Sequence, residues 1–190
     1  MKILRYTLSL VLLSVSTVAF AQSDMHKLAD APAPSAAQKS FATMKTFAGE
    51  WEGRVTVAEM PKMNAGMLMH ASLRVTSRGN AMVHELQEAN APVDPAKYDH
   101  PVTMLYVDGD QLNLVHYCDA GNRPRMIGKM SPDGKTVEFT LVDISGGNKN
   151  GHMAHAVFTY VDANHHVEDW TYLMPDDKPM HAHFDLHKVN

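Results

Sequence analysis

From Trp51 onward, apolar and polar residues alternate with a period of two. The segment "WEGRVTV" places Trp51, Gly53, Val55 and Val57 on one face and Glu52, Arg54 and Thr56 on the other. The segment "MLMHASLRVT", residues 67–76, alternates in the same way. Because successive side chains of a strand point to opposite faces, this pattern is typical of strands buried on one side.

Turn signals divide the rest of the chain into short segments. They are "SRGN", "DGD", "PDGK", "DANH" and "PDDKP". The segments between them predict strands over residues 50–59, 67–76, 81–88, 102–107, 111–118, 124–130, 136–143, 152–161, 166–173 and 180–188. Short hairpin connections favour an all-β fold, an antiparallel up-and-down barrel of about ten strands. A sandwich of two sheets is the alternative.

The barrel domain is expected to span residues 41–190, with a short helix at its start. In "SFATMKTFAGEW", Phe41, Met44 and Phe47 recur every three residues, and Gly49 ends the pattern. Residues 22–40 contain Ala-Pro repeats and few large apolar residues, which predicts a flexible leader.

Residues 1–21 have the pattern of a secretory signal peptide. Lys2 and Arg5 precede an apolar run over 8–18, and Ala19-Phe20-Ala21 matches the A-x-A cleavage pattern. We therefore expect a periplasmic or secreted protein. A membrane-spanning helix needs about 20 apolar residues, and no later segment has them, so no membrane span is expected.

Composition narrows the classes of partner. The chain has 17 basic and 21 acidic residues, and two of the basic ones lie in the predicted signal peptide. A net acidic chain argues against nucleic acid as a partner, because phosphate binding needs a concentrated basic face. The chain also has 14 methionines and 12 histidines. These residues are either copper ligands, or the methionines fill an apolar interior and the histidines lie on solvated strand faces.

Two short motifs resemble known families. Gly49-Glu50-Trp51 is similar to the G-x-W signature of the lipocalin and fatty-acid-binding (calycin) barrels, in which the tryptophan closes one barrel end, and Lys188 would be the basic residue that packs over it. The segment "GEWEG" resembles the start of the nitrobindin-type haem barrel. The segment "HYCDAGNRPRM" is similar to exported calycin-like proteins of the DUF1579 kind. The resemblance implies a barrel that holds a small ligand.

The segment "QLNLVHYCDA" places Leu112, Leu114, His116 and Cys118 on one face of a strand. A nucleophilic thiol needs a lowered pKa and an oriented base, and no glycine-rich elbow or helix N-terminus lies near Cys118 in the sequence. The two side chains are therefore either part of the apolar interior or lining of a ligand cavity. Catalysis by this pair is the third and weakest alternative.

Arg123 and Arg125 flank Pro124, so in an extended segment they project to the same side. Two such guanidinium groups could bind a ligand carboxylate at the barrel mouth, or they could pair with nearby acids such as Asp119 or Glu138.

In "KPMHAHFDLHKV", His181, His183, Asp185 and His187 share one face, and Ala182, Phe184 and Leu186 share the other. The apolar face is expected to point inward, which leaves these histidines in solvent. If the assignment were reversed near the mouth, His181 and His183 could bind haem or copper. No H-E-x-x-H or C-x-x-C motif supports a zinc site.

These patterns favour a container over a catalyst. The expected ligand is small and mostly apolar, with an acidic head group as one option, and the expected contact residues are Trp51, Met69, Leu114, His116, Cys118, Arg123 and Arg125. No catalytic residues and no cofactor are expected, with haem or copper as the alternative.

Overall fold

The computed structural model describes residues 33–60, 62 and 66–189. The predicted signal peptide and most of the predicted leader lie outside these residues. The described part contains helix α1 (Ala36–Thr46), a 3-10 turn (Ser77–Gly79) and ten strands. The strands are β1 (Gly49–Val57), β2 (Met67–Thr76), β3 (Ala81–Glu88), β4 (Val102–Asp108), β5 (Gln111–Tyr117), β6 (Arg123–Met130), β7 (Thr136–Ser145), β8 (His152–Asp162), β9 (His165–Leu173) and β10 (Pro179–Lys188).

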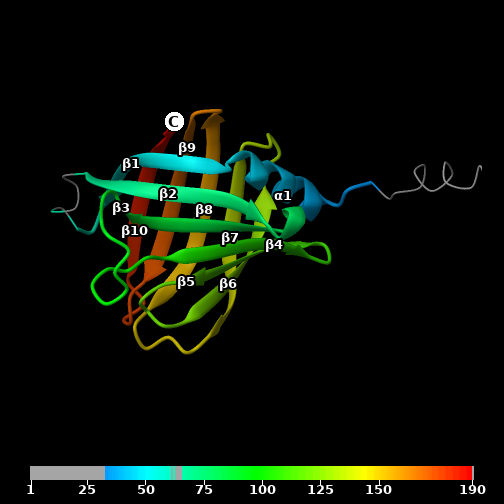
Figure 1. The fold of residues 1–190 in the computed structure, drawn as a ribbon. Coiled ribbons are helices and arrows are strands. Elements are labelled where there is room, and N and C mark those ends of the chain that lie inside the picture. Colours follow the sequence, from blue (N-terminus) through cyan, green and yellow to red (C-terminus); the bar gives the residue numbers. More distant parts are fainter. Residues whose placement is uncertain (1–32, 61, 63–65, 190) are drawn as a thin grey trace, which may run out of the picture. The chain divides into compact units, whose positions relative to one another are not determined.

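The ten strands form one closed antiparallel barrel in which sequence neighbours pair and β1 pairs with β10 (Figure 1). The predicted up-and-down barrel is therefore confirmed, and the sandwich alternative is not. The closing ladder runs from Trp51 opposite Lys188 to Val57 opposite Ala182. Closure gives every strand two neighbours, so no strand is left with a row of unpaired backbone groups.

The alternation predicted for β1 is the one found, since Trp51, Gly53, Val55 and Val57 are buried. Gly53 is required by close packing across the closing ladder. A Cβ atom at this position would lie 1.7 Å from the backbone oxygen of Asp185. Any larger residue would push β1 away from β10.

Helix α1 begins five residues earlier than expected, at Ala36, so the predicted leader boundary at residue 40 lies inside the helix. The earlier start is explained by Ser35, whose hydroxyl accepts a hydrogen bond from the Gln38 backbone while the Gln38 side chain accepts one from the Ser35 backbone. This capping box provides acceptors for two backbone N–H groups at the start of the helix. The spacing of apolar residues gives no indication of it. No helix among the described residues is long and apolar enough to cross a membrane.

The two ends of the barrel differ. At one end, here called the helix end, α1 packs against β4, β5 and β6, and the buried Phe47 and Trp51 fill the interior. The opposite end, the open end, carries the longest connection, residues 89–101 between β3 and β4. In Figure 1, α1 lies to the right of the barrel and this connection to the lower left.

Trp51 is 2% exposed, and its indole N–H donates to the Phe47 carbonyl over 2.8 Å. The ammonium group of Lys188 lies 5.4 Å from the ring centre, where the sequence resemblance placed a basic residue. Because the ring fills the helix end, we expect Trp51→Ala to lower the free energy of unfolding by about 3 to 5 kcal/mol. Urea denaturation measures this, with Tyr117→Ala as the control because Tyr117 is an exposed aromatic residue. Equal urea midpoints for wild type and Trp51→Ala would contradict the role of the indole.

Candidate functional site

A buried carboxylate lies inside the barrel. Glu168, on β9, is fully buried and accepts hydrogen bonds from His166 over 3.0 Å and from the Trp170 indole N–H over 2.9 Å. The Nε2 atom of His84, on β3, lies 3.3 Å from the same carboxylate. Burial alone would raise the pKa of Glu168, but His84 and His166 outweigh it and hold this pKa well below its usual range. The carboxylate is therefore charged in the folded protein.

His116, on β5, lies beside this network. Its Nδ1 atom is 2.9 Å from the Thr103 hydroxyl, and its ring centre is 5.5 Å from that of Trp170. Its Nε2 atom is buried and has no hydrogen-bond partner in the described part of the chain. Burial, helped by nearby His84, lowers the pKa of His116 to about 4. The ring is therefore neutral at pH 7, and one of its nitrogens is free to bind another group.

Next to His116, the open end of the barrel is hollow. This space, here called the barrel cavity, has a volume of about 360 Å³. Its walls are mainly apolar, and they include two methionines and three large aromatic side chains. The lining residues are Leu86, Asp99, Pro101, His116, Cys118, Asp119, Met153, Trp170, Tyr172, Met180, Ala182 and Phe184. It is the kind of site that binds a small, mostly apolar molecule with a few directed polar contacts.

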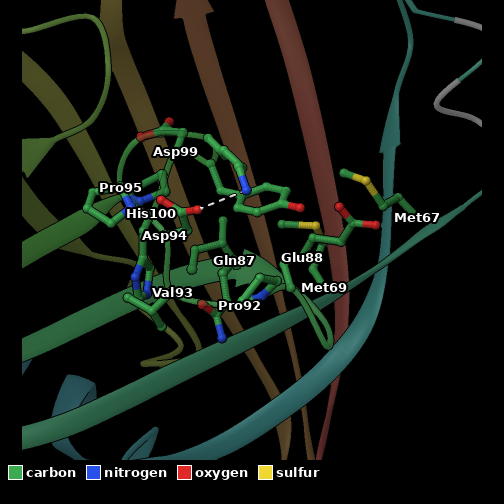
Figure 2. Close-up of a pocket in the computed structure, with 15 residues that line it drawn as sticks. Met67, Met69, Gln87, Glu88, Pro92, Val93, Asp94, Pro95, Asp99 and His100 are labelled. Atoms are coloured by element: carbon green, nitrogen blue, oxygen red, sulfur yellow. Dashed lines mark ion pairs between the residues drawn. The ribbon is translucent and has the colours of Figure 1, made fainter.

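A second space of about 510 Å³, here called the loop hollow, lies beneath the β3–β4 connection. Figure 2 shows the thioethers of Met67 and Met69 on one side of it and Asp94, Pro95 and His100 on the other. The dashed line marks the ion pair of Lys97 with Asp94, at 3.4 Å. The loop hollow and the barrel cavity share Leu86, Asp99 and Pro101, so the connection forms a wall of both.

The mouth of the barrel cavity is acidic. The Asp119 backbone N–H donates to the Asp99 carboxylate over 3.1 Å. Burial, and then the charge of Asp119, raises the pKa of Asp99. Burial also raises the pKa of the Cys118 thiol. A protonated thiol is a poor nucleophile, so this geometry argues against catalysis by Cys118.

The structure brings together only some of the residues singled out in the sequence. His116 and Cys118 line the barrel cavity, and Met69 lines the loop hollow. Leu114 is completely buried in the core, and Trp51 lies at the helix end. These last two stabilise the barrel at a distance from the cavity.

Arg123 and Arg125 lie on the outer side of β6, because Pro124 and Met126 are the buried residues there. Arg123 donates to the Ser145 hydroxyl over 3.1 Å. Arg125 donates to the Asp143 carboxylate over 3.0 Å and to the Asn113 side chain over 3.1 Å. Of the two predicted roles, pairing with a nearby acid is the one seen for Arg125, and the acid is Asp143.

His181 and His183 point outward, as expected from the apolar face of β10. Each Nδ1 atom lies 2.7 Å from a carboxylate oxygen, of Glu59 for His181 and of Asp169 for His183. Neither ring faces the barrel cavity, since neither is among its lining residues. The structure therefore gives no support to a haem or copper site built from this pair.

The polar network of His84, His166 and Glu168 was not predicted from the sequence. A signal was present, because His166, Glu168 and Trp170 are two residues apart and therefore share one face of β9. A large aromatic residue on that face marks it as the inner one. His84 carried no such signal, because its position relative to Glu168 depends on barrel closure.

Comparisons with known proteins agree with the fold. No family model matches the chain, and no curated protein sequence matches it. Among solved structures, Rv2717c from M. tuberculosis is similar with a TM-score of 0.57 and 13% identity, over 80% of this chain and 98% of that one. A protein of unknown function from the DUF3598 family, from Nostoc punctiforme, is similar with a TM-score of 0.51 and 6% identity, over 77% of this chain and 49% of that one. These similarities support a calycin-like barrel fold.

The low pKa of His116 predicts a dependence of stability on pH. Between the ordinary value of 6.5 and the folded value of about 4, the unfolded chain binds more protons at this residue than the folded one. The contribution of His116 to stability is therefore complete above pH 6.5 and is lost as the pH falls toward 4. We expect the free energy of unfolding to fall less steeply between pH 6.5 and 5 in His116→Gln than in wild type.

Urea titrations at several pH values measure this slope. His183→Gln is the control, because it removes a histidine from the outer surface of the barrel and not from its interior. A His116→Gln slope equal to that of wild type would show that His116 is not buried in its neutral form.

Proposed function

We propose that this protein binds a small, mostly apolar molecule in the barrel cavity. The observation that carries the proposal is a mainly apolar space of about 360 Å³ that is lined by His116, whose buried Nε2 atom has no hydrogen-bond partner among the described residues. A buried polar atom without a hydrogen bond costs about 1 to 3 kcal/mol. A ligand that fills the cavity and bonds to this nitrogen would recover that free energy and bury apolar surface as well.

The polar group of the ligand is neutral or cationic in this proposal. No lysine or arginine is among the described residues that line the barrel cavity, whereas Asp99 and Asp119 are. A ligand carboxylate would lie near these two acids without a cationic partner. The acidic head group suggested by the sequence is therefore disfavoured on electrostatic grounds.

The proposed role is binding without chemical conversion of the ligand. The raised pKa of Cys118 and the lowered pKa of His116 are both opposite to what a thiol nucleophile and its base require. The N-terminal pattern of Lys2, Arg5 and Ala19-Phe20-Ala21 supports a periplasmic or secreted location. The motif "HYCDAGNRPRM" supports membership of the DUF1579 kind, and its histidine and cysteine are the two that line the cavity.

A cavity-filling substitution tests the proposal. Ala182 lines the barrel cavity, so Ala182→Phe should occupy part of it and weaken binding of the neutral fluorescent probe N-phenyl-1-naphthylamine by at least about tenfold. Thr140→Phe is the matched control, because it adds the same ring to an exposed position of β7. Probe fluorescence measures both affinities. Equal probe affinity in wild type and Ala182→Phe would place the binding site elsewhere.

The role of the arginines is tested separately with the same probe and a fatty-acid probe. We expect the double variant Arg123→Gln, Arg125→Gln to bind both probes as wild type does, because Arg125 is already paired with Asp143 on the outer surface. Loss of fatty-acid binding in this variant would instead support the acidic ligand. Native mass spectrometry of protein purified from its own host would identify the retained molecule.

A further inference from the structure

We propose that His165, Asp185 and His187 form a binding site for a divalent transition-metal ion on the outer surface of the barrel. This site is at the helix end, where β9 begins and β10 ends, and it is independent of the barrel cavity. It differs from the pair His181 and His183 considered from the sequence. It comes from the strand register, which places residues 20 positions apart next to each other.

Three ligand atoms converge at this site. The Nε2 atom of His165 lies 2.8 Å from Oδ1 of Asp185, and the Nε2 atom of His187 lies 3.4 Å from the same oxygen. All three ligand atoms lie within 4.8 Å of one another. In a tetrahedral zinc site with bonds of about 2.0 to 2.1 Å, ligand atoms are about 3.3 Å apart. The three side chains therefore need only small shifts to surround one ion.

The backbone holds the two histidines in place. His165 and His187 are directly opposite each other in the β9–β10 ladder, and their rings stack with centres 4.3 Å apart. Asp185 is two residues before His187 on the same outward face of β10. A rigid ladder lowers the conformational entropy lost on binding, which favours affinity.

The charges around the site suit a cation. Glu52, on β1, is opposite His187 in the closing ladder and offers a second carboxylate on the same outer face. Arg54, opposite Asp185, donates to the Gly66 carbonyl and is thereby held toward the β1–β2 connection. Two imidazoles and a carboxylate are a ligand set that Zn²⁺ and Cu²⁺ both accept.

Three other outward histidines lack this convergence. His155, His181 and His183 each contact a single carboxylate, from Glu138, Glu59 and Asp169 respectively. Among the described residues, none of these three belongs to a group of three converging ligands. They therefore serve as internal controls for weak binding of metal to surface histidines.

The experiment is a calorimetric titration of the purified protein with Zn²⁺ at neutral pH. We expect one equivalent to bind at micromolar concentration, and His165→Ala and His187→Ala each to weaken that binding by at least about tenfold. Asp185→Asn, which keeps the shape of the side chain, should weaken it as well. His183→Ala is the matched control on the same strand and face, and it should bind Zn²⁺ as wild type does.

A second measurement identifies the ligands directly. With one equivalent of Cu²⁺, the electron paramagnetic resonance spectrum should show coupling to nitrogen that diminishes in His165→Ala and His187→Ala. Urea midpoints near that of wild type would show that the variants are folded. The proposal is overturned if Zn²⁺ binds only at millimolar concentration, or if His183→Ala weakens binding as much as His187→Ala does.

Discussion

The pairing of β1 with β10 is the constraint on which the rest of this structure depends. It turns a row of hairpins into a closed barrel, so each strand has one face inside and one outside. At Gly53 the two strands are so close that only a hydrogen fits in place of a side chain. Because side chains alternate along every strand, closure assigns each residue to the interior or the surface.

The interior created by this closure is not purely apolar. Glu168 is charged and fully buried, its hydrogen-bond donors His166 and Trp170 lie on β9, and the His84 ring approaches it from β3. Removing a charge from water costs several kcal/mol, so a buried carboxylate persists only where hydrogen bonds and nearby imidazoles compensate. This arrangement ties the strands together at mid-barrel, and the neutral His116 extends the polar side chains toward the open end.

The two ends have different roles because they are filled differently. At the helix end, Phe47 stacks edge-on against Phe158 and His166, and Trp51 packs edge-on against His166. At the open end, small or unbranched side chains such as Ala182, Met153 and Met180 leave space unfilled. The same barrel is thus a packed core at one end and a container at the other. Its outer surface places histidines beside carboxylates, and at one position it places two histidines beside the same carboxylate.

Much of the fold could be predicted from the sequence, because the signals involved are local. Alternation of apolar and polar residues located all ten strands, and glycine-rich and aspartate-rich turns separated them. The same alternation predicted that His116 and Cys118 share a face and that the histidines of β10 point outward. The capping box at Ser35 is equally local, but it consists of polar residues, so the spacing of apolar residues did not reveal it.

The sequence by itself therefore determined the strands, their two faces and the antiparallel order. Only the tertiary structure decided which distant side chains meet, because this depends on register between strands and on barrel closure. His84 reaches Glu168 from a strand more than 80 residues away, and His165 meets His187 across a ladder. Arg125 pairs with Asp143 next to a shift of register between β6 and β7. A period of two defines the faces of one strand, but it carries no information about the neighbour that will lie opposite.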